Sequence, residues 1–154
     1  MKNRKLMVCI IILLSTLTIK SIAGPPAEGS IAVIKSYINS YVNNDCKLMN
    51  KILADNAKLK LSRGETLLVE SRETIVDFMR ECGKMTLNCD SKYEVLSNNP
   101  SLVVACVDFD FQNATQHIYL VIEENSDKEW KITDICKIIN DKDDLPASNS
   151  LTKN

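Results

Sequence analysis

Residues 101–124, SLVVACVDFDFQNATQHIYLVIEE, contain two segments with the alternation of β-strands, Leu102–Phe111 and Gln116–Ile122. The polar stretch QNAT separates these segments and is typical of a hairpin turn. Similar polar turns delimit two further segments of the same type, Thr86–Leu96 and Trp130–Ile139. The second half of the chain is therefore predicted to form an antiparallel meander of four strands.

The strand Leu102–Phe111 is apolar on both of its faces. One face holds Val103, Ala105, Val107, Phe109 and Phe111, and the other begins with Leu102, Val104 and Cys106. A sheet with one solvated face shows polar residues at every second position, so we expect both faces of this strand to be covered. Helices would cover one face. The outer face would be covered either by a second subunit, which gives a homodimer, or by the C-terminal tail folding over it.

The first half of the mature chain has helical periodicity. Apolar residues recur at three- and four-residue steps from Ser30 to Val42, and Asp45 is placed to cap a short helix, Cys46–Ala54. Two short strands, Ala57–Leu61 and Thr66–Glu70, come next. A third helix then begins after Ser71 and ends near Gly83, with a predicted buried stripe of Ile75, Phe78, Met79 and Cys82. Early helices and a late meander predict an α+β domain with the helices on one face of a curved antiparallel sheet.

The first 23 of the 154 residues have the pattern of a secretory signal peptide. A basic start precedes an apolar run, and Ser21-Ile22-Ala23 offers a small-residue cleavage site. The alternative is a membrane anchor, but about 14 apolar residues fall short of the roughly 20 needed to span a bilayer. We therefore expect a secreted or periplasmic protein with no membrane contact after signal removal. A linker at 24–29, a domain at 30–140 and a polar tail at 141–154 would follow.

Charge and cysteine content restrict the function further. The chain has 19 basic and 20 acidic residues, and four of the basic ones lie in the leader, which leaves 15 against 20 and argues against nucleic-acid binding. Five cysteines remain after leader removal, of which Cys82 and Cys89 are close enough in sequence for a disulfide. The equal alternative is that all five are buried thiols. His117 is the only histidine and no cysteine pair has C-x-x-C spacing, so the sequence predicts neither a metal site nor a cofactor.

Four short motifs resemble the nuclear transport factor 2-like superfamily, which includes SnoaL-like cyclases and ketosteroid isomerases. They are YINSYVNND at 37–45, ADNA at 54–57, SRETI at 71–75 and EWKI at 129–132. Each motif is weak alone, but their order and spacing cover residues 30–139. Within the superfamily, the chain is most similar to small secreted bacterial proteins named for lumazine binding. The resemblance implies a cone-shaped sheet with three helices on its concave face and a pocket at the open end.

The resemblance also implies where catalytic groups would lie. Tyr37 matches the helix-one tyrosine of the isomerase branch, but Lys60, Leu61 and Ser62 stand where the carboxylate base would fall. The second acid is missing from the inward positions of the strand Gln116–Ile122. A non-catalytic domain is therefore favoured, either binding a small apolar or aromatic ligand or acting as a dimeric interaction module. The alternative is a SnoaL-like isomerase, cyclase or hydrolase that uses Tyr37 and an unidentified acid or base.

The candidate pocket residues could also be ordinary core residues. They are Tyr37, Tyr41, Phe78, Ile118 and Trp130. His117 alternates onto the face opposite Ile118, where a surface or interface role is favoured over a proton shuttle. Asp108 and Asp110 share a strand face, so a paired-carboxylate site is conceivable, although solvated positions at the outer end of the strand are favoured.

Overall fold

The computed structural model describes residues 26–63 and 65–141. The predicted signal peptide at 1–23 and almost all of the polar tail lie outside the described residues. Of the predicted linker, Pro26 and Ala27 precede the first helix, and that helix already includes Glu28 and Gly29. In the described part of the chain, no helix is long and apolar enough to cross a membrane.

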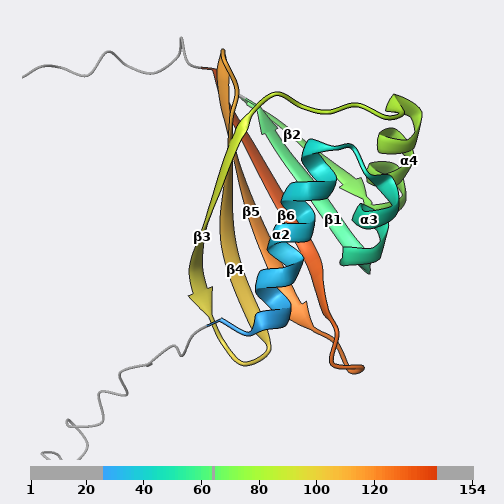
Figure 1. Ribbon diagram of the computed structural model, residues 1–154, viewed down its shortest axis with the longest axis vertical. Helices are drawn as coiled ribbons and strands as arrows, with labels where there is room; N and C mark the ends of the chain where they lie inside the picture. The colour runs from blue at the N-terminus through green and yellow to red at the C-terminus, as the bar shows by residue number, and fades with distance from the viewer. Residues whose placement is uncertain (1–25, 64, 142–154) are drawn as a thin grey trace, which may run out of the picture.

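The order of the elements is helix, helix, two strands, helix and four strands, as predicted (Figure 1). The helices are α2 (Glu28–Val42), α3 (Cys46–Ile52) and α4 (Arg72–Cys82). The strands are β1 (Leu53–Arg63), β2 (Thr66–Ser71), β3 (Asp90–Asn98), β4 (Leu102–Asp110), β5 (Ala114–Glu124) and β6 (Trp130–Asp141). The largest differences at the start of an element are four residues: β1 begins at Leu53, where the second helix was expected to continue, and β3 begins at Asp90 instead of Thr86.

The six strands form one curved sheet in the order β2-β1-β6-β5-β4-β3, with the three helices on one side of it (Figure 1). Four neighbouring pairs are antiparallel, but β1 pairs with β6 in parallel. The predicted α+β fold with a curved, mostly antiparallel sheet is confirmed, and the β1–β6 junction is its one parallel pair. Hairpin turns require antiparallel pairing only of strands that follow each other directly, and β1 and β6 are far apart in sequence.

The core lies between α2 and the inner face of the sheet. On β4, Val103, Ala105, Val107 and Phe109 are fully buried, as are Ile118, Leu120 and Ile122 on β5. The predicted inward face of both strands is confirmed by this alternation. The outer-face residues Leu102, Val104 and Cys106 are partly exposed in the single chain, and the homodimer through this face stays a prediction.

Three predicted caps are confirmed. The Asp45 carboxylate accepts two amide hydrogen bonds at the start of α3, and the Ser71 hydroxyl accepts one at the start of α4. Gly83, with φ of 69°, ends α4 in a conformation that favours glycine.

The predicted buried stripe of α4 is wrong in part. Val76 and Met79 are the buried residues of this helix, whereas Phe78 is 67% exposed and Cys82 is also exposed. The helix contacts α3 and the β1–β2 edge of the sheet. Its buried stripe is therefore shifted toward Val76 and away from Phe78 and Cys82.

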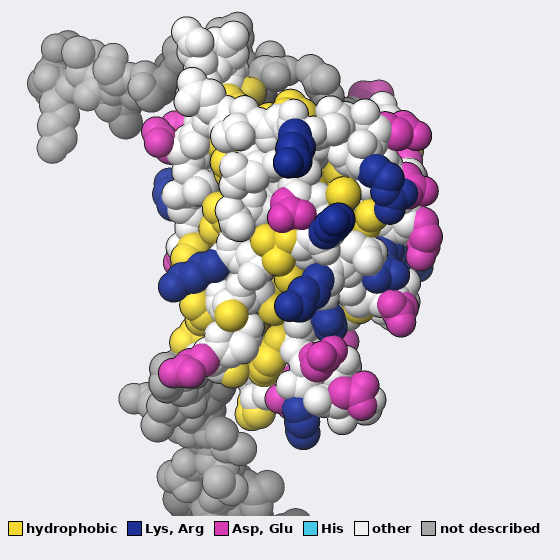
Figure 2. All heavy atoms as spheres, turned by 45° about the vertical axis from the view of Figure 1, so that its right-hand side comes forward, with side chains coloured by type: hydrophobic (Ala, Val, Ile, Leu, Met, Phe, Trp, Pro, Cys, Tyr) yellow, Lys and Arg dark blue, Asp and Glu magenta, His cyan; other side chains and the backbone are white. Residues whose placement is uncertain are grey.

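Charged side chains of both signs are interspersed on the side that carries α3 and α4, with apolar atoms showing between them (Figure 2). A surface that binds nucleic acid usually carries a continuous basic field. The expectation that the chain does not bind nucleic acid stays a prediction.

Candidate functional site at the C-terminal end of α2

Tyr41, in the last turn of α2, is the centre of a polar cluster on the inner face of the sheet. Its ring lies 4.6 Å from the Phe109 ring and 6.0 Å from the Tyr37 ring, measured between centroids. Its hydroxyl donates a hydrogen bond of 2.7 Å to Oε1 of Gln116 on β5. An aromatic wall and a fixed polar group therefore meet at one end of the helix.

Lys137 on β6 completes the cluster. Its Nζ donates a hydrogen bond of 2.6 Å to the Tyr41 hydroxyl oxygen and lies 5.0 Å from the centre of the Tyr41 ring. Among the described side chains, no carboxylate lies within ion-pair distance of Lys137. The cation is held by a hydroxyl and a π face instead of by a counter-charge.

Burial determines the protonation of this cluster. It lowers the pKa of Lys137 to about 8, because desolvation disfavours the ammonium form. Burial, and to a smaller extent the nearby Cys89, raises the pKa of Tyr41 to about 12. At neutral pH, Tyr41 is therefore a neutral hydroxyl and Lys137 is mainly a cation.

The arrangement is suited to holding a negative group. A lysine ammonium has three donor hydrogens, and the Tyr41 hydroxyl uses one of them. Tyr41 and Lys137 are each partly exposed, so neither side chain is sealed in the core. Cys89 packs against the same core, and burial raises the pKa of its thiol, which makes it a poor nucleophile.

Solved structures with the same architecture are numerous. A nuclear transport factor 2-like protein of unknown function from Silicibacter pomeroyi has a TM-score of 0.61 at 14% identity, covering 71% of this chain and 92% of that chain. A ketosteroid isomerase-like protein from Erwinia carotovora has a TM-score of 0.55 at 10% identity, covering 71% and 92%. A cystatin-like fold protein from Burkholderia xenovorans has a TM-score of 0.58 at 13% identity, covering 71% and 87%.

The chain has the nuclear transport factor 2-like fold. No family model matches the sequence, and no curated protein matches it either. TM-scores of 0.55–0.61 establish the fold, whereas identities of 10–14% leave the function open.

Within this nuclear transport factor 2-like fold, the predicted pocket residues do not form one group. Tyr37 and Ile118 lie in the core beside the Tyr41 cluster, with Tyr37 only 2% exposed. Trp130 packs against Gly29 at the opposite end of α2, where a Cβ on the glycine would lie 2.5 Å from the indole ring. Phe78 is on the exposed side of α4, because that helix buries its other flank, so it does not line an internal pocket in the single chain.

Gln116 and Lys137 were missed as site residues. The sequence predicted that Gln116 faces inward on its strand. It was considered only as a position where the isomerases would have an acid, and not as a site residue in its own right. Lys137 pairs with the inward Ile118 in the sheet register, so its side chain also belongs to the inner face. The sequence did contain a signal, because Lys137 alternates with apolar residues that face the core. Recognising its partner, however, requires knowing which strand pairs with β6.

An open cleft of about 670 Å³ lies elsewhere, near the α3–β1 junction and the β5–β6 hairpin. Charged groups line it, and many already have partners. Arg72 pairs with Asp55 at 3.4 Å and donates to the Asn50 carbonyl, while Lys131 pairs with Glu129 at 3.2 Å. Leu53 and Ala54 are the apolar residues among those that line this cleft, and the others are polar or charged, so the Tyr41 cluster is the stronger candidate for an apolar ligand.

The outer face of the sheet holds the other predicted polar residues. His117 lies there, as the alternation predicted. Asp108 and Asp110 do not pair with each other: Asp108 contacts His117 at 2.7 Å, and Asp110 accepts a hydrogen bond from Thr115. The favoured reading of Asp108 as a merely solvated carboxylate is wrong, because its register position is directly opposite His117.

Proposed function

We propose that this domain binds a small aromatic or apolar molecule that carries an anionic group, such as a carboxylate or a sulfonate. Lys137 would bind the anionic group while the partly exposed Tyr41 ring, supported from behind by the buried Phe109 and Tyr37, contacts the apolar body. The observation that carries the proposal is a half-buried ammonium that no described carboxylate neutralises.

The energetics support a ligand of this type. A hydrogen bond to a charged group contributes about 1.5–3 kcal/mol, and more where water is partly excluded. The ammonium is already largely desolvated in the free protein, so part of the cost of binding an anion has been met in folding. The predicted apolar or aromatic ligand is thereby refined to one with a negative end.

A fluorescent anion is a direct probe. We expect 8-anilinonaphthalene-1-sulfonate to bind the folded protein, and Lys137→Met to weaken that binding by about 10-fold or more, since one charged hydrogen bond is lost. The uncharged N-phenyl-1-naphthylamine has a similar apolar body and should bind both proteins alike. Lys35→Met, at an exposed position of α2, is the matched control and should change neither affinity.

Two outcomes would reject the proposal. One is equal sulfonate affinity in Lys137→Met and the unaltered protein. The other is the absence of sulfonate binding by a protein that circular dichroism shows to be folded. A loss of affinity in Lys35→Met as large as in Lys137→Met would show that only general surface charge matters.

Proton transfer by Lys137 is a second candidate function, and it is favoured by one observation. A pKa of about 8 places a lysine in the range of a general base near neutral pH. In that case Tyr41 would donate a hydrogen bond to the developing anion, and Lys137 would be the acid or base that the sequence did not locate. Selective reductive alkylation of Lys137 over Lys35 at pH 7.5, mapped by mass spectrometry, would support this role, and equal modification would count against it.

Export is part of the same proposal. A cleaved leader would place the ligand site outside the cytoplasm, in a secreted or periplasmic protein. N-terminal sequencing of the mature protein should begin at Gly24, and recovery of an uncleaved chain from the cytoplasm would contradict it.

A further inference from the structure

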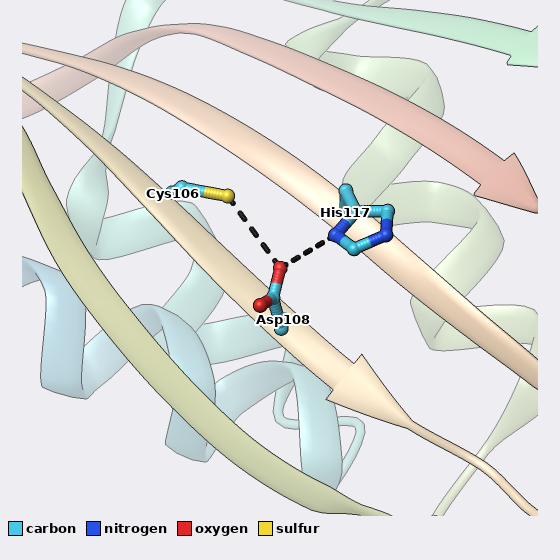
Figure 3. Close-up of side chains that lie close together, drawn as sticks. All are labelled: Cys106, Asp108 and His117. Carbon is cyan, nitrogen blue, oxygen red and sulfur yellow. Dashed lines mark hydrogen bonds and ion pairs between the residues drawn. The ribbon is translucent and has the colours of Figure 1, made fainter. Parts of the chain in front are cut away.

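Cys106, Asp108 and His117 converge on the outer face of the sheet, on the side opposite the helices (Figure 3). Cys106 and Asp108 are two residues apart on β4, so their side chains share one face. His117 on β5 is directly opposite Asp108 in the register. Three donor types from two neighbouring, fully paired strands therefore meet at one point of a rigid sheet.

The three side chains are already joined to one another. The His117 Nδ1 atom lies 2.7 Å from Oδ1 of Asp108, and the Cys106 thiol donates to the same oxygen at 3.5 Å. The three donor atoms all lie within 4.8 Å of one another. None is fully buried: the Asp108 side chain is 21% exposed and the His117 side chain 34% exposed.

We propose that Cys106, Asp108 and His117 form a binding site for a divalent transition-metal ion of the Zn²⁺ type. The ligand site proposed at the Tyr41 cluster does not require this metal, and the two sites lie on opposite faces of the sheet. The sequence argued against a metal because His117 has no ligand partner at close spacing, whereas strand pairing supplies two partners from β4.

The donor chemistry favours zinc-like ions over magnesium or calcium. Thiolate and imidazole are ligands of borderline-soft metals, and Mg²⁺ and Ca²⁺ select sites made of oxygen atoms. Three protein ligands also leave a fourth tetrahedral position open to water or to another molecule.

The spacing of the donors is close to what such an ion needs. Tetrahedral coordination with Zn–S of about 2.3 Å and Zn–O or Zn–N of about 2.0 Å places sulfur and oxygen donors about 3.5 Å apart. The Cys106 sulfur and the Asp108 oxygen are separated by 3.5 Å. The Asp108 oxygen and the His117 nitrogen must move apart by about 0.6 Å to reach the roughly 3.3 Å of the same geometry. The Cys106 sulfur and the His117 nitrogen lie within 4.8 Å of each other and must come to about 3.5 Å, which rotation of the partly exposed imidazole can supply.

Neighbouring groups modify the site without blocking it. Lys92 pairs with the other Asp108 oxygen at 3.5 Å, but its side chain is 81% exposed and can swing away. Glu94 on β3 is opposite Cys106 and adds negative charge. Burial, the Asp108 charge and the hydrogen bond to Asp108 raise the pKa of Cys106 to about 11, so an incoming cation must displace the thiol proton.

A cysteine nucleophile is a weaker reading of the same three residues. The Cys106 thiol donates to a carboxylate instead of to the imidazole, and its raised pKa keeps it protonated. Activated cysteines have a lowered pKa and an adjacent positive group. A cation that neutralises the thiolate and the carboxylate together suits the geometry better.

Cobalt absorption spectroscopy tests the site because a Co²⁺–thiolate bond has its own charge-transfer absorption. We expect the reduced full chain to bind one Co²⁺ with this absorption, and Zn²⁺ to displace it. Cys106→Ser should abolish the charge-transfer band. His117→Gln should keep it but weaken the affinity by about 100-fold or more, since even groups behind the ligands change affinity by 10- to 100-fold.

Cys136→Ser is the matched control. Cys136 is a partly exposed thiol on the same face of the sheet, with Tyr119 of β5 between it and Cys106. This variant should keep the band and the affinity. Circular dichroism on every variant shows whether the fold is retained. If Cys106→Ser does not fold, its lost band is not informative, and the affinity of His117→Gln becomes the deciding measurement.

Three results would overturn the proposal. They are the absence of a charge-transfer band in the folded chain at 100-fold excess Co²⁺, a band that survives Cys106→Ser, and equal affinity in His117→Gln and the unaltered chain.

Discussion

Replacing Lys137 by methionine tests the buried cation on which the proposed site depends. Methionine has a similar length and removes the charge while it retains apolar contact with the Tyr41 ring. In the folded chain, desolvation lowers the pKa of Lys137 from 10.5 to about 8. In the unfolded chain, the ammonium regains water and its ordinary pKa.

The direction in which the stability of the unaltered chain changes with pH follows from proton linkage. Between pH 8 and 10.5, the unfolded chain holds this proton more strongly than the folded chain, so the free energy of unfolding rises with pH through this window. Below pH 8 both states are protonated, and the full cost of burying the charge remains. That cost is about 3 kcal/mol at pH 7 and about 1 kcal/mol at pH 9.5, from 1.36 kcal/mol per pKa unit. Because the side chain keeps some solvent contact, these values are upper limits.

The measurement is the difference in unfolding free energy between Lys137→Met and the unaltered chain. Urea unfolding at pH 7 and pH 9.5, followed by the fluorescence of Trp130, gives this difference at each pH. The contacts with Tyr41 that are independent of charge cancel when the two pH values are compared. We expect the stability advantage of Lys137→Met to fall by up to about 2 kcal/mol between pH 7 and pH 9.5.

Lys35→Met is the control, because Lys35 is exposed on α2. Its difference from the unaltered chain should be the same at both pH values. If the Lys137→Met difference were also unchanged with pH, the ammonium would be solvated in the folded state. The reasoning that assigns it to an anion site would then fail.

Three further predictions concern packing and capping, and each is measured by urea unfolding. Gly29→Ala should destabilise the fold by about 1–3 kcal/mol, although alanine favours helix, because its Cβ would overlap the Trp130 ring; equal or greater stability would contradict the close approach. Phe109→Ala should cost about 3–5 kcal/mol, while Phe78→Ser, at an exposed position of α4, should change stability by at most about 0.5 kcal/mol; a large effect at Phe78 would support the stripe predicted from the sequence. Asp45→Ala should cost about 1 kcal/mol through the lost N-cap of α3, whereas Asp45→Asn should retain most of that stability.

Two predictions about covalent and quaternary state remain open to direct assay. Cys82 is exposed and Cys89 partly buried, both as free thiols in the structure, and the choice between a disulfide and five thiols stays a prediction. Thiol titration of the unfolded mature protein without reductant should count three thiols if Cys82 and Cys89 are joined and five if they are not. Sedimentation at micromolar concentration tests the homodimer through the outer face.

Much of the fold followed from local patterns. The repeat of apolar residues in α2 and the alternation in β4 and β5 each report burial within one element, so they predicted the helix, the strands and their inward faces. Asp45 and Ser71 predicted helix starts because a cap acts on amides two or three residues away. The predicted stripe of α4 was misplaced because the side of this helix that is buried depends on which elements it contacts.

Local sequence patterns predicted less of the two candidate sites. Tyr41 was identified as a candidate, but its partner Lys137 is 96 residues away in sequence. Cys106 and Asp108 were seen to share a face, yet His117 was judged isolated because its partners are on another strand.

The order of secondary-structure elements, the helix caps and the apolar faces of α2, β4 and β5 were determined by the sequence alone, because each depends on residues within a few positions of one another. The parallel junction of β1 with β6, the Tyr41–Lys137 contact and the Cys106–Asp108–His117 cluster were decided only by the tertiary structure. Each of them depends on the strand order and register of the sheet, through which residues distant along the chain come within hydrogen-bond distance. Local periodicity contains no information about that pairing, so the chemistry of this protein becomes visible only once the sheet is assembled.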